Sequence, residues 1–186
     1  MVKTIPTTCR LALLPLLVAA ALLAGGCFPG GSGNDDDGGR DSSVKGVSAV
    51  KPIRKDRDAT DAFARVNDER ARRGMQTLRR RADLDAVAYT HARDLMHMNR
   101  LSHTSSDGRQ LENRLAKLDW EWAGENLARN KGFDSPAAEA VKGWIASPKH
   151  FENMFRPDYS QSGMAALYDP DSGFTYFVQI FIIPVD

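Results

Sequence analysis

Three patterns of apolar and polar residues follow one another along this chain of 186 residues. Residues 11–23 are apolar, and only Pro15 interrupts the run. Residues 28–57 are rich in glycine, serine and aspartate and contain few apolar residues. From residue 58 onward, apolar residues recur first at helical spacing and then in short β-like runs. The pattern predicts one folded domain over residues 58–186, preceded by two segments of other kinds.

Helical spacing is clearest over Ala82–Arg100, where it predicts a helix with one apolar face. That face comprises Leu84, Val87, Ala88, His91, Ala92, Leu95 and Met98. Three more helices are expected. The first is capped by Thr60 and stops at Gly74, the second covers residues 108–118, and the third starts at Ser135-Pro136 and ends at Pro148.

The C-terminal part has the pattern of a β-hairpin. Residues 169–173 (Asp-Pro-Asp-Ser-Gly) are typical of a turn. The run 174–183 is rich in aromatic and β-branched residues and predicts a strand, which pairs with the short segment 163–168. Helices followed by a hairpin indicate an α+β domain in which helices pack on a small antiparallel sheet.

The N-terminal segment has the features of an export signal. Lys3 and Arg10 precede an apolar run that is too short to span a bilayer comfortably. The segment Leu23-Ala24-Gly25-Gly26-Cys27 resembles a bacterial lipobox. The resemblance implies a signal peptide over residues 1–26, a lipid on Cys27 that anchors the protein in a membrane, and a flexible tether over residues 27–57. The alternative is an ordinary cleaved signal in which the cysteine is incidental.

These features predict an exported, membrane-anchored lipoprotein of the bacterial envelope. Phe28, rather than aspartate, follows Cys27, which favours the outer membrane or a periplasm-facing position. The formal net charge of +1 gives no reason to expect nucleic acid as a partner. Cys9 and Cys27 are the two cysteines, and Cys9 lies within the signal, so no internal disulfide is expected.

Three polar residues in separate segments are candidates for a common site. His103 follows Ser102, Glu125 lies in a Gly-Glu-Asn triplet, and His150 lies in the run Ser147-Pro148-Lys149-His150. Two imidazoles and one carboxylate form an acceptable zinc site with an open fourth position. The alternative is a hydrogen-bonded buried cluster that holds loops together without any metal.

The order of these motifs is similar to that of the CAP superfamily, the cysteine-rich secretory, antigen 5 and pathogenesis-related proteins. The resemblance covers about residues 60–183 and is closest to the short bacterial SCP-like form. It includes Val66-Asn67, Arg70, His91-Ala92, Ser102-His103, Gly108, Arg114, Gly124-Glu125-Asn126, Trp144, His150, Asn153 and Tyr176-Phe177.

This resemblance implies an αβα sandwich with a central cleft, which in some relatives binds a divalent metal. His103, Glu125 and His150 match the two cleft histidines and one of the two cleft glutamates. Ser147 stands where the second glutamate is expected. Asn126, Trp144 and Asn153 match motif positions for which we expect structural roles, with Trp144 in the core.

Other residues have simpler interpretations. His91 lies on an apolar helix face and is expected to be a hydrogen-bonded core residue. The six arginines of a basic cluster are expected to form a solvated surface, with contact to anionic lipid as the alternative. They are Arg70, Arg72, Arg73, Arg79, Arg80 and Arg81. No Gly-x-Ser-x-Gly motif indicates a nucleophile.

The sequence therefore predicts a ligand-binding or interaction module that uses the His/Glu cleft to hold a lipid or another envelope component. It requires no cofactor, and a divalent metal such as zinc is an option. The first alternative is a metal-assisted hydrolase of the cell envelope in which zinc activates water. The second is a purely structural domain.

Overall fold

The computed structural model describes residues 53–185, so the predicted signal peptide, Cys27 and most of the tether lie outside the described residues. A four-stranded sheet occupies the centre, in the order β1-β3-β4-β2. Its strands are β1 (Arg79–Arg80), β2 (Trp122–Asn130), β3 (Gln161–Tyr168) and β4 (Thr175–Ile183). β4 pairs antiparallel with both β2 and β3, whereas the two-residue β1 pairs parallel with β3. The sheet is therefore mixed rather than wholly antiparallel.

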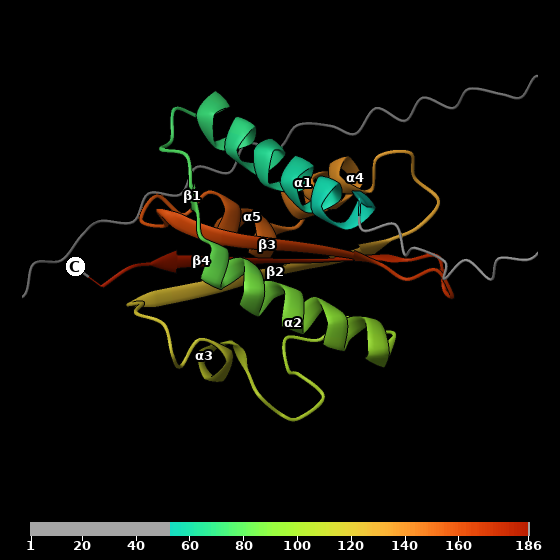
Figure 1. Ribbon diagram of the computed structural model, residues 1–186. Helices are drawn as coiled ribbons and strands as arrows, with labels where there is room; N and C mark the ends of the chain where they lie inside the picture. The colour runs from blue at the N-terminus through green and yellow to red at the C-terminus, as the bar shows by residue number, and fades with distance from the viewer. Residues whose placement is uncertain (1–52, 186) are drawn as a thin grey trace, which may run out of the picture. The chain divides into compact units, whose positions relative to one another are not determined.

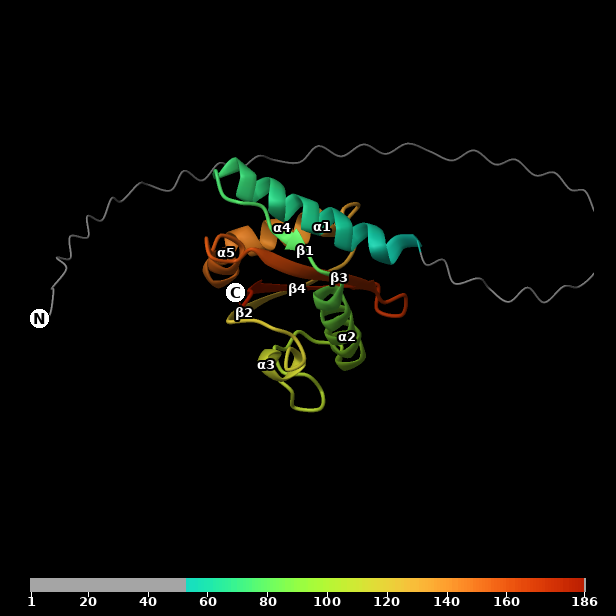
Figure 2. The same ribbon diagram turned by 60° about the vertical axis from the view of Figure 1, so that its left-hand side comes forward.

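Helices cover both faces of this sheet (Figure 1). Helices α1 (Ile53–Arg72), α4 (Pro136–Ala146) and α5 (Pro148–Met154) lie on one face. Helices α2 (Ala82–Met98) and α3 (Leu111–Arg114) lie on the other, and the turned view separates the two layers in the same way (Figure 2). The predicted αβα sandwich is confirmed.

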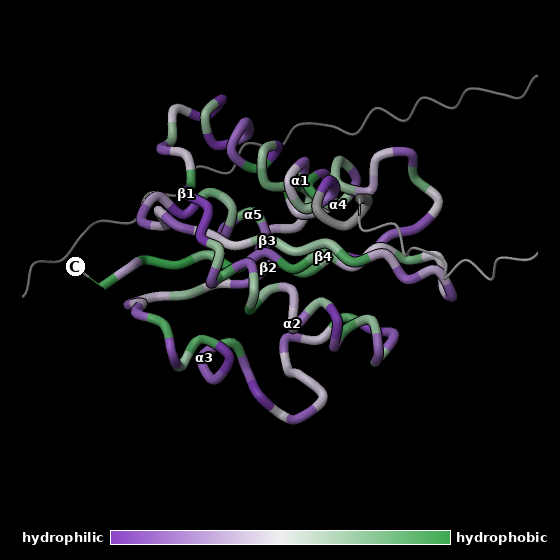
Figure 3. The backbone as a smooth tube through the Cα atoms, in the orientation of Figure 1, coloured by the Kyte–Doolittle hydropathy of each residue, from purple (hydrophilic) through white to green (hydrophobic). Residues whose placement is uncertain are grey.

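The alternation of side chains along β4 explains why the sheet needs a helical layer on each face. Phe177 and Phe181 pack in the core beneath α1, α4 and α5. Tyr176, Val178 and Ile180 pack in the second core, beneath α2. The central strand is hydrophobic along much of its length (Figure 3). Both cores are built from residues of the compact unit Gly46–Asp186, which we therefore expect to fold by itself.

Two helix predictions agree well with the structure. Helix α2 covers Ala82–Met98 and ends where Asn99 adopts a left-handed conformation with φ of 48°. Helix α4 begins at Pro136, directly after the N-cap Ser135, whose hydroxyl accepts a hydrogen bond from the Ala138 amide.

Two other helix predictions were wrong, and helix α5 was not predicted. Helix α1 starts at Ile53, so Thr60 lies inside it, because no proline or glycine separates these positions. Helix α3 has four residues instead of the predicted 108–118. Pro148 does not merely end α4: it is the first residue of α5, a position that suits proline's fixed φ and missing N–H.

Candidate functional site

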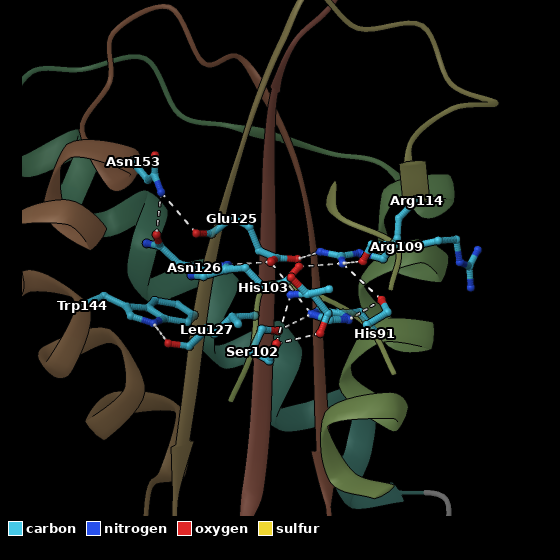
Figure 4. Close-up of polar contacts among 12 residues, drawn as sticks. His91, Ser102, His103, Arg109, Arg114, Glu125, Asn126, Leu127, Trp144 and Asn153 are labelled. Atoms are coloured by element: carbon cyan, nitrogen blue, oxygen red, sulfur yellow. Dashed lines mark hydrogen bonds and ion pairs between the residues drawn. The ribbon is translucent and has the colours of Figure 1, made fainter. Parts of the chain in front are cut away.

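Glu125 and Asn126 are neighbours in β2, and their side chains enter different layers of the sandwich because strand residues alternate. The Glu125 side chain points toward His103, His91 and Arg114, on the α2 and α3 side (Figure 4). The Asn126 side chain points toward Asn153 of α5. The Gly-Glu-Asn triplet thus lies inside a nine-residue strand and links two polar clusters.

The Glu125 carboxylate is the centre of the first cluster. Its side chain is only 2% exposed and is enclosed by cationic and imidazole groups. Oε1 lies 2.8 Å from His103 Nδ1 and 3.9 Å from His91 Nε2. Oε2 lies 2.5 Å from an Arg114 nitrogen. A buried carboxylate requires such partners, since desolvation otherwise disfavours its charge.

His103 is held at one ring nitrogen and open at the other. Its side chain is 63% exposed, although Nδ1 is hydrogen-bonded to Glu125. In the neutral ring, a proton on Nδ1 directed at the carboxylate leaves a lone pair on Nε2. The imidazole borders a pocket of about 280 Å³ that is also lined by Thr104, Gln110, Leu111, Glu112 and Glu125. The ring can therefore accept a hydrogen bond from a ligand in this pocket.

Arg114 fixes the loop that carries His103. Its Nη1 donates to the carbonyl of His103 at 2.9 Å and to that of Arg109 at 3.2 Å. The same nitrogen donates to Ser105 Oγ at 3.2 Å. One guanidinium thus holds both Glu125 and the loop that presents His103.

His91 is buried in the core, as predicted, at 1% exposure. Its Nε2 lies 2.9 Å from the Ser102 carbonyl and its Nδ1 lies 3.3 Å from Ser105 Oγ. Burial lowers the pKa of His91, against the attraction of the Glu125 charge, so the neutral ring is favoured. Sequence spacing did not indicate that His91 adjoins Glu125 or that Ser105 adjoins His91, because separate segments bring them together.

The second cluster surrounds Asn126 on the α5 side of β2. Asn126 Nδ2 donates to the His150 carbonyl at 3.0 Å, so this bond involves the backbone of His150 and not its ring. Asn153 Nδ2 donates to Asn126 Oδ1 at 2.9 Å and to the Glu125 carbonyl at 3.2 Å. Burial lowers the pKa of His150, and the charge of His103 lowers it further.

Side chains from α4 and α5 also cap the backbone of β2, which is an edge strand. Trp144 is 1% exposed, and its Nε1 donates to the Leu127 carbonyl at 2.9 Å. Asn153 caps the carbonyl of Glu125, two residues earlier. Carbonyls two residues apart point the same way, so these two donors leave less of the strand for another chain to pair with.

The positions of the three proposed metal ligands do not fit a metal site. Within residues 53–185, no three His, Cys, Asp or Glu side chains are grouped so that they could hold a metal ion. Glu125 already uses one oxygen for His103 and the other for Arg114. His150 lies in α5, across the sheet from the layer that encloses the Glu125 carboxylate. We therefore derive no chemistry through zinc.

One member of the basic cluster was wrongly predicted to be solvated. Arg70 has 0% exposure, and burial lowers its pKa. Its guanidinium donates to the carbonyls of Gln76, Met154, Arg156 and Tyr159 at 2.7–3.1 Å. These hydrogen bonds stabilise a cation that is buried away from water, and they connect α1 to the end of α5 and the segment after it. The other five arginines are exposed or half-buried, as expected.

Residues 63–181 match the family model described as CAP, the cysteine-rich secretory protein family. The match extends over more than half of the sequence, and the chain belongs to this family. The resemblance predicted from the order of the motifs is confirmed.

Known relatives include surface and membrane proteins of bacteria. The membrane protein YlbC of Bacillus subtilis is 34% identical over 101 residues, which cover 53% of this chain and 28% of that protein. An extracellular SCP-domain protein of Bacillus anthracis has a TM-score of 0.61 and 27% identity over 69% of this chain and 41% of that chain. This chain thus spans less than half the length of either relative.

A smaller solved structure matches almost throughout. An outer surface protein of Borrelia burgdorferi has a TM-score of 0.62 and 23% identity, over 69% of this chain and 94% of that chain. At this identity the likeness shows the fold alone. In residues 53–185 of the present chain, no helix has the length and apolar character needed to cross a membrane.

Proposed function

We propose that this protein is an exported, membrane-tethered module that binds a polar component of the cell envelope in the cleft beside His103. The observation that carries the proposal is the orientation of His103. Glu125 holds Nδ1, and the exposed ring borders a pocket that the loop and α3 enclose. Ser105, the serine whose hydroxyl contacts a histidine in this cluster, is buried and also accepts a hydrogen bond from Arg114, so the geometry favours binding over nucleophilic hydrolysis.

The sequence and the relatives support export and tethering. The basic residues, apolar run and Cys27 have the order of a lipoprotein signal, and a polar stretch separates Cys27 from α1. Two relatives are described as an extracellular protein and a membrane protein. Replacing Cys27 by serine should move the protein from the membrane fraction to the soluble exported fraction. Retention in the membrane would contradict lipid anchoring at this residue.

The pocket lining indicates the chemistry of the ligand. Thr104 and Gln110 offer a hydroxyl and an amide beside the imidazole, and Leu111 offers an apolar contact. Such a set suits hydroxyl and amide groups, which abound in the glycan and peptide parts of a bacterial envelope. A soluble muramyl dipeptide contains both kinds of group and is therefore a suitable first probe.

The test is an NMR titration of the ¹⁵N-labelled unit Gly46–Asp186 with muramyl dipeptide. We expect chemical-shift changes around residues 103–112 that are lost in His103→Ala. His97→Ala is the matched control, because His97 is an exposed histidine outside this pocket. Shifts that persist in His103→Ala would refute binding at this cleft. Cleavage of the probe that disappears in His103→Ala would show an enzyme instead of a binding module.

A further inference from the structure

Arg114 is a buried cation in the middle of the His103–Glu125 cluster. Its side chain is 3% exposed, and one of its terminal nitrogens contacts Glu125 Oε2 at 2.5 Å. The other terminal nitrogen is occupied by two carbonyls and the Ser105 hydroxyl. The guanidinium is thus engaged at both terminal nitrogens and has no freedom to swing into the solvent without breaking this network.

The position of Arg114 conflicts with a metal ion on Glu125 Oε2. Zinc binds a carboxylate oxygen at about 2.0–2.2 Å, which is closer than the Arg114 nitrogen lies. An ion on the Arg114 side of Oε2 would have to displace the guanidinium, and an ion on the other lone pair would lie close to it. Two positive groups at such a distance in a desolvated site repel each other strongly.

The other oxygen of Glu125, Oε1, is also unsuitable as a zinc ligand in its present position. Two ligand atoms on one tetrahedral zinc lie roughly 3.3 Å apart, as follows from metal–ligand distances of about 2.0–2.1 Å. Glu125 Oε1 and His103 Nδ1 are 2.8 Å apart, which is the distance of a direct hydrogen bond. A metal between them would have to separate the pair and remove the proton that now joins them.

We propose that Arg114 is the resident cation beside Glu125 and keeps divalent metals off the Glu125 carboxylate. Arg114 compensates the Glu125 charge, and Glu125 in turn orients His103. The ligand is consequently held without a metal on Glu125, through hydrogen bonds to His103 Nε2 and with the neighbouring pocket residues. Metal-free ligand binding rests on the function proposed above, whereas the exclusion of metal by Arg114 does not.

The experiment is a calorimetric titration of Zn²⁺ into the metal-stripped unit Gly46–Asp186 and its variants. The wild type should show no zinc binding that is lost in Glu125→Gln. Arg114→Gln should bind zinc at least tenfold more tightly than the wild type, and adding Glu125→Gln should abolish the gain. Arg109→Gln is the matched control, since Arg109 is an exposed arginine of the same loop that pairs with Asp107. It should behave as the wild type.

Several outcomes would overturn the proposal. One is micromolar zinc binding by the wild type that is lost in Glu125→Gln. Another is a folded Arg114→Gln variant with no gain in zinc affinity. If Arg114→Gln does not fold, urea unfolding of the double variant Arg114→Gln/Glu125→Gln decides whether Arg114 compensates the Glu125 charge. The double variant should fold and be more stable than Arg114→Gln, because it removes the unpaired buried charge. Failure of that rescue would refute charge compensation by Arg114.

A second titration separates this inference from the proposed function. Muramyl dipeptide should bind the wild type equally well with and without EDTA. If the probe does not bind at all while the zinc results hold, the ligand proposal fails and the role of Arg114 stands. If the probe binds only after zinc is added, the metal-free cleft is refuted and ligand binding stands.

Discussion

Gly124 is the position in β2 where a single methyl group should be most damaging. A Cβ atom at this residue would lie 2.5 Å from Tyr159 Oη and 2.8 Å from Asn153 Oδ1. Both distances are well below normal van der Waals contact. Gly124→Ala should therefore destabilise the fold and disturb the polar cluster around Asn126.

The size of the effect depends on whether the two neighbours can move. Tyr159 is 1% exposed and its ring stacks on Phe181 with centroids 5.4 Å apart. Asn153 is held by its bonds to the Glu125 carbonyl and to Asn126. Overpacking in such surroundings costs about 1–3 kcal/mol, and each hydrogen bond lost adds about 1 kcal/mol. Alanine restricts the unfolded chain, which returns up to about 1 kcal/mol. We expect a net loss of about 2–3 kcal/mol.

The assay is urea unfolding of the unit Gly46–Asp186, followed by tryptophan fluorescence. Gly143→Ala is the matched control, because Gly143 lies in α4 and a methyl group added there would have nothing within 4 Å. That variant should be stabilised by about 0.5–1 kcal/mol, since alanine is the better helix former. If Gly124→Ala unfolds within about 0.5 kcal/mol of the wild type, close packing around Gly124 does not limit the stability of the fold.

Three further predictions concern Trp144, Arg70 and His91. Trp144→Ala should lower the free energy of unfolding by about 3–5 kcal/mol in urea, because a fully buried ring is removed; a loss below about 1 kcal/mol would contradict its place in the core. Arg70→Met should cost at least about 3 kcal/mol, because buried carbonyls lose a charged donor. In the same assay Arg72→Met, at a 63% exposed side chain, should cost less than about 0.5 kcal/mol. Equal losses would contradict the stabilising role of the carbonyls around Arg70. Burial holds the pKa of His91 below its unfolded value of about 6.5, so the unfolded chain takes up a proton first as the pH falls. Stability should therefore decrease below about pH 6.5 and be independent of this group above it. Urea unfolding from pH 5 to 8 should show a smaller decrease in His91→Asn, and an identical pH dependence would exclude His91 as the source.

Local sequence patterns were sufficient for the elements whose signals are strong. The apolar stripe between residues 82 and 98 predicts α2, since one face must be buried. The turn residues between β3 and β4 predict the hairpin. The patterns failed at the start of α1, the length of α3 and the existence of α5, where short segments depend on the neighbours against which they pack.

The sequence also identified His103 and Glu125 as members of one polar cluster, because they match the cleft histidine and glutamate of the CAP family. It did not identify the other partners of Glu125. His91 and Arg114 reach the carboxylate, whereas His150 belongs to α5 and its backbone carbonyl accepts a hydrogen bond from Asn126. Strand alternation sends Glu125 and Asn126 to different faces, and no spacing in the sequence shows which loops cover each face.

By itself, then, the sequence determined the family, the layered architecture and two of the residues that define the cleft. These follow from periodicity and motif order, which are properties of short segments. Only the tertiary structure decided the charge balance of the cleft and the burial of Arg70. Both depend on carbonyls and side chains that are distant in sequence and meet only when the helical layers close over the sheet.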